Sequence, residues 1–233
     1  AKVLAQVETM ILGKDHEVRL ARTCLLAEGH LLIDDIPGVG KTTLALALAR
    51  SLGCSFMRIQ GTSDLLPADI LGTSVFNPAT RGFEFKPGPI FHAVVLADEI
   101  NRASPKTQSA LLEAMAERQV TVDGTTYPLP LPFFLIAPQN PHEAHGTFPL
   151  PESQLDRFLM RVALGYPDHA HEAEILTQGP SPARANKLPA VSTPEEVNAS
   201  IQATGAVRVD PAVDGYLLAL VRETRQSPFV DLG

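Results

Sequence analysis

The sequence predicts an α/β fold in which a parallel β-sheet is flanked by helices. Apolar runs of strand length alternate with stretches that have helical spacing, and polar or glycine-containing turns follow several of the runs. An order of strand, helix and strand favours parallel strands with right-handed connections. The five expected strands cover residues 31–33, 55–60, 93–97, 133–137 and 159–164.

The composition is that of a globular protein. The chain has 233 residues, 45% hydrophobic and 19% charged, enough for one core with or without a small second domain. A net charge of −7 disfavours a broad surface for nucleic-acid phosphates, so nucleic acid is not an expected partner. No apolar run approaches membrane-spanning length and no secretory leader is recognisable. We therefore expect a cytoplasmic protein in which Cys24 and Cys54 are buried, reduced thiols.

The N-terminal third has the clearest helical patterns. Apolar residues recur at intervals of three and four on both sides of Gly13, which predicts two helices that meet at this glycine. Residues 43–52 are strong helix formers and are followed by Gly53, a favourable residue just beyond a helix end. This helix would connect strand 31–33 to strand 55–60.

The turn between strand 31–33 and that helix is predicted to bind phosphate. Gly38 and Gly40 allow backbone N–H groups to surround an anion, and the following helix directs its positive end to the same place. Lys41 is expected to reach the β and γ phosphates and the Thr42 hydroxyl to bind Mg²⁺. Asp35 occupies the position where the pattern GxxxxGK[ST] has glycine, so the match is imperfect. An ordinary glycine-rich turn with a solvated lysine is the alternative.

Polar side chains also follow two other expected strands. Asp98 and Glu99 come directly after strand 93–97, at the strand end that faces the ligand crevice of a parallel sheet. We expect Asp98 to hold the hydration shell of Mg²⁺ and Glu99 to orient or deprotonate the water that attacks the γ-phosphate. Asn140, after strand 133–137, is expected to sense that phosphate or hold the water. The alternatives are acids at a helix start and a turn residue before proline.

Two hairpins are expected outside the sheet. Residues 74–77 and 82–86 form the first, inserted into a crossover, and residues 119–122 and 125–127 flank the Asp-Gly turn of the second. Between them, Ser104 and Pro105 are typical of a helix start, as N-cap and first helical residue.

Helical patterns replace strands towards the C-terminus. We expect an α/β core over residues 1–165 and a small helical part over residues 166–233, whose helices cover 168–178, 194–203 and 211–226. A connector rich in proline and alanine occupies 180–189. The histidines of segment 142–145 are three residues apart in a loop and lack the spacing of a helical zinc motif. The acids of segment 168–172 are typical of a helix start, and we expect no metal at either segment.

Several stretches together closely resemble MoxR-type AAA+ ATPases: residues 31–42, 97–103, 106–115, 117–122 and 151–158. The resemblance covers essentially the whole chain. It implies an AAA+ P-loop NTPase core with a five-stranded parallel sheet in the order 5-1-4-3-2, a helical lid over 166–233, a helix-2 insert at about 72–88, and assembly as a homo-oligomer, usually a hexameric ring. The second-sensor arginine of the family is not found before residue 233, so we expect a truncated lid. We also expect these 233 residues to bind nucleotide better than they hydrolyse it.

The resemblance also implies roles for individual residues. Lys41, Glu99, Asn140 as first sensor and Arg157 as arginine finger would be catalytic, with Thr42 and Asp98 at the Mg²⁺. The ATP-binding residues would be Pro37, Gly38, Val39, Gly40, Lys41, Thr42 and Thr43, with Leu12 and Gly13. Arg161 competes for the finger role, and the alternative for Arg157 is an ion pair with Glu152 or Asp156. Pro138, His142 and His145 depart from the residues usual in the family.

Four functions are open, and the resemblance implies the first. The first is an ATP-hydrolysing chaperone for assembly, maturation or metal insertion, whose client is a partner protein that has a von Willebrand A domain or a metal cofactor. The second is the motor subunit of a metal chelatase. The third is a nucleotide-gated binding switch with negligible hydrolysis. The fourth, a DNA-remodelling motor, is disfavoured by the acidic charge.

Overall fold

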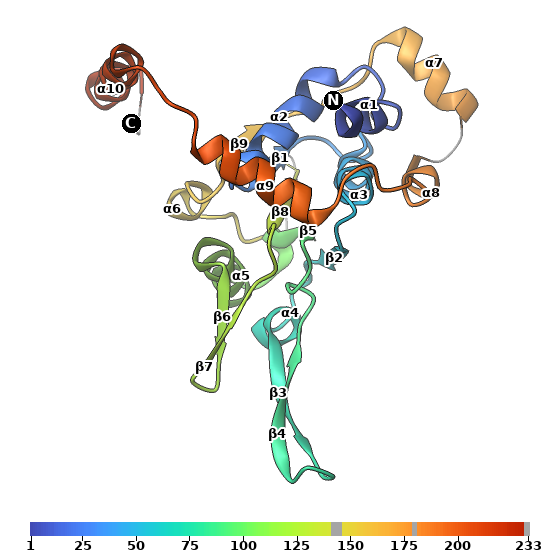
Figure 1. The fold of residues 1–233 in the computed structure, drawn as a ribbon, viewed down its shortest axis with the longest axis vertical. Helices are drawn as coiled ribbons and strands as arrows, with labels where there is room; N and C mark the ends of the chain where they lie inside the picture. The colour runs from blue at the N-terminus through green and yellow to red at the C-terminus, as the bar shows by residue number, and fades with distance from the viewer. Residues whose placement is uncertain (141–145, 179–180, 231–233) are drawn as a thin grey trace. The chain divides into compact units, whose positions relative to one another are not determined.

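A computed structural model describes residues 1–140, 146–178 and 181–230. Its central sheet has five parallel strands in the spatial order β2-β5-β8-β1-β9 (Figure 1). Numbered one to five along the chain, they have the order 5-1-4-3-2, so the expected topology is confirmed. The strands are β1 (Leu31–Asp34), β2 (Phe56–Gln60), β5 (Val94–Asp98), β8 (Phe134–Gln139) and β9 (Met160–Val162).

The central strands are apolar on both faces because each face is covered by helices. Leu31 and Ile33 of β1 pack into one core cluster, whereas Leu32 packs into the other. The first cluster includes residues of α1 (Lys2–Glu8), α2 (Asp15–Leu26) and α3 (Lys41–Ser51). The second includes residues of α4 (Pro67–Leu71) and α5 (Pro105–Glu117). The predicted helix start at Ser104 is confirmed, since its hydroxyl accepts the Thr107 N–H at 3.3 Å.

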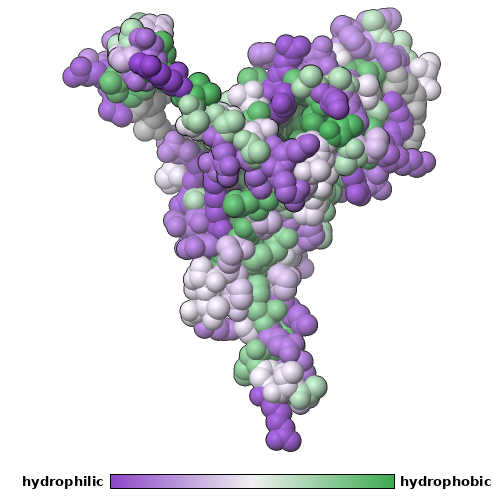
Figure 2. All heavy atoms as spheres, viewed as in Figure 1, coloured by the Kyte–Doolittle hydropathy of each residue, from purple (hydrophilic) through white to green (hydrophobic). Residues whose placement is uncertain are grey.

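Both predicted hairpins are present and extend away from the sheet (Figure 1). Strands β3 (Gly72–Asn77) and β4 (Gly82–Pro87) form the longer one, and β6 (Gln119–Val122) and β7 (Thr125–Pro128) the shorter. Phe85 stacks on Tyr127 with ring centroids 3.9 Å apart, which joins the two hairpins. Phe83 by contrast is 75% exposed, and apolar surface is visible over the longer hairpin (Figure 2).

Some elements differ from the prediction. The short helices α4 and α6 (Glu152–Leu155) and the 3₁₀ helix η1 (Ile100–Arg102) were not expected, because a single turn leaves little periodic pattern. The last strand, Met160–Val162, is shorter than the expected 159–164, and the chain has left the sheet before Gly165, whose N–H donates to the Asp35 carboxylate. Helix α8 (Ser181–Ala185) lies inside the expected connector 180–189.

Helices replace strands after β9, as expected: α7 (His169–Gln178), α8, α9 (Pro194–Gly205) and α10 (Pro211–Gln226). The chain divides into two compact units, residues 1–201 and 202–233. The proposed boundary between core and lid at 165/166 therefore lies where strands give way to helices. That it separates two domains stays a prediction. In the second unit the Asp210 carboxylate accepts the Ala212 N–H at 2.9 Å and caps α10.

Cys24 and Cys54 are free and buried, as predicted. Burial raises the pKa of the Cys24 thiol to about 12 and that of Cys54 to about 11, so both stay protonated. Within the described ranges, no helix has the length and apolar character needed to cross a bilayer.

Candidate functional site

The predicted phosphate loop has the required context, with β1 before it and α3 after it. Gly38 and Gly40 adopt φ of 91° and 98°, a left-handed conformation that side chains other than glycine rarely adopt. Gly40 is the N-cap of α3, so the first N–H groups of this eleven-residue helix face the loop. A Cβ atom at Gly38 would have nothing within 4 Å, which leaves open space above the loop. The loop can therefore surround an anion.

Asp35, the unusual first residue of the loop, has a structural role. The residue is only 8% exposed, and its carboxylate accepts the N–H of Ile36 at 2.8 Å and that of Gly165 at 2.5 Å. The Asp35 carbonyl oxygen accepts from the Lys41 ammonium, which also donates to the Gln139 carbonyl at 3.3 Å. Asp35 thus contacts both the loop lysine and the segment after β9.

The acid pair at the end of β5 is held by side chains of β2. Two nitrogens of Arg58, Nη2 and Nε, lie 2.5 and 3.0 Å from Oδ2 of Asp98. Oε2 of Glu99 accepts from Nε2 of Gln60 at 2.8 Å and lies 3.2 Å from Nε of Arg102. Both carboxylates therefore have cationic or amide partners on the side of β2 and η1.

The backbone of Glu99 is strained. Its φ of 52° is left-handed, which is rare for residues other than glycine and occurs often at functional sites. The preceding residue is anchored to the segment after β2, because the Gly61 N–H donates to the Asp98 carbonyl at 2.7 Å. A Cβ at Gly61 would stand 2.2 Å from the Glu99 carbonyl oxygen, so only glycine permits this approach.

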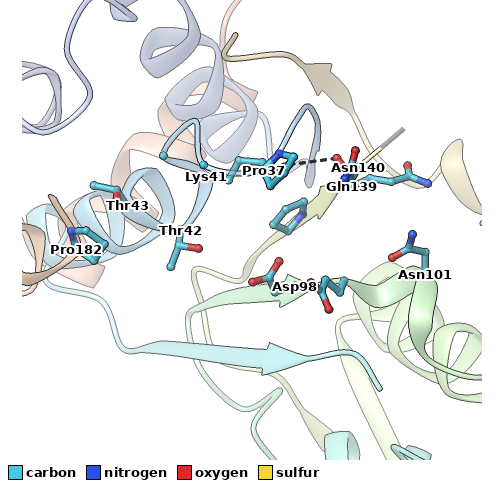
Figure 3. Close-up of a pocket in the computed structure, with 13 residues that line it drawn as sticks. Pro37, Lys41, Thr42, Thr43, Asp98, Asn101, Gln139, Asn140 and Pro182 are labelled. Carbon is cyan, nitrogen blue, oxygen red and sulfur yellow. Dashed lines mark hydrogen bonds between the residues drawn. The ribbon is translucent and has the colours of Figure 1, made fainter. Parts of the chain in front are cut away.

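A cavity of about 390 Å³ gathers most of the predicted residues at the carboxyl ends of the strands (Figure 3). The predicted ones are Pro37, Gly38, Gly40, Lys41, Thr42, Thr43, Asp98, Glu99 and Asn140. Asn101, Pro138, Gln139 and Pro182 line it too, and no role had been assigned to them. Asn101 lies two residues after Glu99 and Gln139 is the last residue of β8, so their positions at strand ends could have indicated them.

A second cavity, of about 120 Å³, adjoins the first, because Gly38, Gly40 and Thr43 line both. Its other lining residues include Met10, Ile11, Leu12, Val39, Tyr166, Pro167 and Ile175, which make it largely apolar. Leu12 and Val39 line this cavity, and their contact with nucleotide stays a prediction. Gly13 lines neither cavity; instead, a Cβ there would stand 2.8 Å from Nδ1 of His171. The first cavity holds the charged side chains Lys41, Asp98 and Glu99 beside the anion loop, and the second is lined mainly by apolar side chains. This pairing suits a nucleotide, with phosphates in the first and base in the second.

The two arginines that compete for the finger role lie outside both cavities. Arg157 is exposed, and its Nη1 donates to the Leu112 carbonyl at 3.0 Å. Within the described ranges it forms no ion pair with Glu152 or Asp156. Arg161 instead pairs with Asp34 across the β1–β9 ladder.

The two histidine segments are in different situations. His142 and His145 lie outside the described residues. In the other segment, the Asp168 carboxylate accepts the N–H of His171 at 3.0 Å, a capping contact at the start of α7. This bond and that of the His171 ring lower the pKa of Asp168.

Comparisons with known proteins agree with this geometry. The family described as "ATPase family associated with various cellular activities (AAA)" matches residues 30–160. Over 188 residues the chain is 44% identical to "Chaperone MoxR1" of Mycobacterium tuberculosis, which covers 80% of this chain and 50% of that protein. The chain belongs to the MoxR-type AAA+ ATPases.

Two further relatives extend the likeness beyond the matched core. This MoxR-type chain is 47% identical over 232 residues to "Uncharacterized protein YeaC" of Bacillus subtilis, and the match covers 100% of the chain and 72% of that protein. A crystal structure from Cytophaga hutchinsonii, assigned as an ATPase, has a TM-score of 0.83 and 37% identity and covers 95% of this chain and 67% of that one. The chain thus spans between half and about three quarters of these relatives.

Proposed function

We propose that this chain binds ATP with Mg²⁺ and hydrolyses the ATP to ADP and phosphate, as the motor of a chaperone that matures a partner protein. The observation that carries the proposal is the single cavity that gathers Lys41, Asp98 and Glu99 at the end of the sheet. One cation and two carboxylates beside an anion loop are the groups that hydrolysis of a phosphoanhydride needs.

Each residue has a part in the reaction. Lys41 leaves the two carbonyl oxygens that it contacts and turns towards the β and γ phosphates, whose charge it stabilises. Glu99 orients a water molecule and accepts its proton as the water oxygen bonds to the γ-phosphorus. The bond from that phosphorus to the β–γ bridging oxygen breaks, and ADP leaves with the electron pair. Asn140 lines the same cavity and orients the γ-phosphate or the water.

The residues present fit Mg²⁺. Thr42 offers a hydroxyl and Asp98 a carboxylate in the same cavity, and magnesium prefers such oxygen ligands together with water and phosphate (Figure 3). When bound, the ion neutralises charge that develops on the phosphate oxygens. Arg58, which now pairs with Asp98, would have to share that carboxylate.

Arg157 is proposed to act in a neighbouring subunit of a hexameric ring. It lies outside the chain's own nucleotide cavity and is exposed, and its rival Arg161 is engaged by Asp34. An exposed guanidinium that reaches the γ-phosphate of an adjacent subunit would make turnover depend on assembly. The lid boundary at residue 165, the cytoplasmic location and a client with a von Willebrand A domain or metal cofactor belong to the same proposal.

The test replaces Glu99 in the full-length protein. Glu99→Gln should retain binding of a fluorescent ATP analogue within about threefold and lower phosphate release at least about 100-fold. Glu113→Gln, an exposed acid of α5 outside the cavity, is the matched control and should leave both unchanged. Lys41→Met should abolish binding. Without nucleotide binding by the parent protein, the proposal is wrong.

The remaining functions are outcomes of the same experiments. Binding without any turnover that Glu99→Gln removes would favour the nucleotide-gated switch over the motor. Affinity capture on the ATP-loaded Glu99→Gln protein should recover a client whose retention requires nucleotide. Capture of a metal-inserting catalytic subunit would instead favour the motor of a metal chelatase, and retention of DNA that salt weakens would favour the DNA motor.

A further inference from the structure

We propose that the Asp35 carboxylate is a mechanical link between the phosphate loop and the segment 165–167, through which nucleotide occupancy moves the start of the helical region. The inference rests on the proposed nucleotide binding and adds a positioning residue to it. Asp35 stands where the loop pattern has glycine, so phosphate binding itself does not require a carboxylate at this position. Its hydrogen bonds to the loop and to Gly165 point to a different role.

The contacts of Asp35 lead in two directions. Towards the loop, its carbonyl accepts from the Lys41 ammonium and its carboxylate accepts the Ile36 N–H at 2.8 Å. Away from the loop, the same carboxylate accepts the Gly165 N–H at 2.5 Å, a bond that joins residues 130 positions apart. Hydrogen bonds to an ionised and buried acceptor are stronger than neutral ones, so the loop and the Gly165 backbone are held firmly together.

The segment beyond Gly165 forms part of the nucleotide site. Gly165, Tyr166 and Pro167 line the smaller cavity, and Ile175 of α7 lines it with them. The Tyr166 carbonyl accepts a hydrogen bond from the Lys14 ammonium at 2.8 Å. Lys14 lies between α1 and α2, so this bond also fixes the segment to the N-terminal helices. A shift at Gly165 would therefore move a wall of this cavity together with the beginning of α7.

Nucleotide binding supplies the displacement. When Lys41 turns towards phosphate it leaves the Asp35 carbonyl, so the peptide between Asp35 and Ile36 loses one of its two hydrogen bonds and can reorient. The Asp35 carboxylate accepts the Ile36 N–H of that peptide, so the carboxylate moves with the peptide. The Gly165 N–H then either follows the carboxylate or loses its acceptor. The occupied and empty loops would thus set two positions of segment 165–167.

Hydrogen exchange with and without nucleotide tests the link in the full-length protein. Saturating ADP or a non-hydrolysable ATP analogue should change the exchange rate of a peptide covering 163–168 at least about threefold in the parent. In Asp35→Gly, which restores the usual glycine, nucleotide should still bind while this difference disappears and exchange at 163–168 becomes faster in both states. Asp35→Asn, which keeps the side-chain size, should lose the difference as well.

Asp34→Asn is the matched control, because Asp34 is the adjacent acid and pairs with Arg161 rather than with the loop. It should keep the nucleotide-dependent difference. A difference that persists in both Asp35 variants, or a parent that binds nucleotide without any change at 163–168, would overturn the link and leave the proposed function intact. A parent that binds no nucleotide would overturn both.

Discussion

The Gln60 side-chain amide donates a hydrogen bond of 2.8 Å to the Glu99 carboxylate. Its oxygen accepts from Nη2 of Arg58, also at 2.8 Å. A guanidinium has only donors and a carboxylate only acceptors, so one orientation of the amide satisfies both neighbours. Strand β2 therefore fixes the direction from which Glu99 is held, through residues two apart that lie on the same face of the strand.

We expect Gln60→Ala to lower ATP turnover about tenfold, because a hydrogen bond to a charged group stabilises by about 1.5–3 kcal/mol and 1.4 kcal/mol corresponds to a factor of ten. Nucleotide affinity should change less than about twofold, since the amide contacts the carboxylate rather than the loop. Steady-state phosphate release and titration with a fluorescent ATP analogue measure the two. Gln119→Ala, an exposed glutamine of β6, is the control. Turnover at or above the parent value would show that Gln60 restrains Glu99 instead of positioning it.

Gly61→Ala should damage both stability and turnover. The new Cβ would stand 2.2 Å from the Glu99 carbonyl oxygen, so the backbone after β5 must move, and overpacking of this kind costs about 1–3 kcal/mol. Urea unfolding gives the loss of stability, and turnover should fall more than tenfold because Glu99 shifts. Gly205→Ala, whose Cβ would enter open space, should change stability by less than about 1 kcal/mol. Equal behaviour of the two variants would contradict the close approach.

The family resemblance implies the sheet order and a local pattern predicts the phosphate loop, but neither predicts the partners of the acids. Short-range patterns are sufficient for the loop, since Gly38, Gly40 and Lys41 are neighbours between a strand and a helix. The contacts of Arg58 and Gln60 depend instead on the register that places Gln60 beside Asp98 on the adjacent strand. Nothing local in 55–60 encodes that register. The same holds for Asp35, which in the sequence is only a mismatch to the loop pattern. Its hydrogen bond to Gly165 depends on the fold, because the two residues are far apart in the chain.

His30 should make the protein sensitive to acid. It is buried, accepts the Leu135 N–H at 3.0 Å and has its other ring nitrogen 3.3 Å from the Met115 carbonyl. Burial lowers the pKa of His30 from 6.5 to about 4. Between these pH values the unfolded state binds more protons than the folded state, so the free energy of unfolding decreases as the pH is lowered. The free energy of unfolding should drop by about 2–3 kcal/mol from pH 7 to pH 4.5 through this group.

Urea unfolding at the two pH values measures this decrease, and His30→Gln provides the reference. The variant is expected to be less stable at pH 7, because the buried N–H of Leu135 loses its ring acceptor. The decrease in its free energy of unfolding between pH 7 and pH 4.5 should nevertheless be smaller than that of the parent, by about 2–3 kcal/mol. An equal pH dependence in both proteins would assign the acid sensitivity to other groups.

Replacing Arg58 tests whether its ion pair with Asp98 weakens or strengthens Mg²⁺ binding. The pair lies partly in solvent, with Arg58 49% and Asp98 17% exposed, and such pairs stabilise by at most about 1 kcal/mol. If Arg58 competes with Mg²⁺ for the carboxylate, Arg58→Ala should lower the Mg²⁺ concentration needed for half-maximal ATP binding by up to about fivefold, since 1 kcal/mol corresponds to that factor. Arg118→Ala breaks a comparable pair with Glu28 outside the two cavities and should leave the required Mg²⁺ concentration unchanged. A higher Mg²⁺ requirement in Arg58→Ala would mean that Arg58 orients Asp98 for the ion. In that case the variant should show both a lower Mg²⁺ affinity and a lower ATP turnover than the parent.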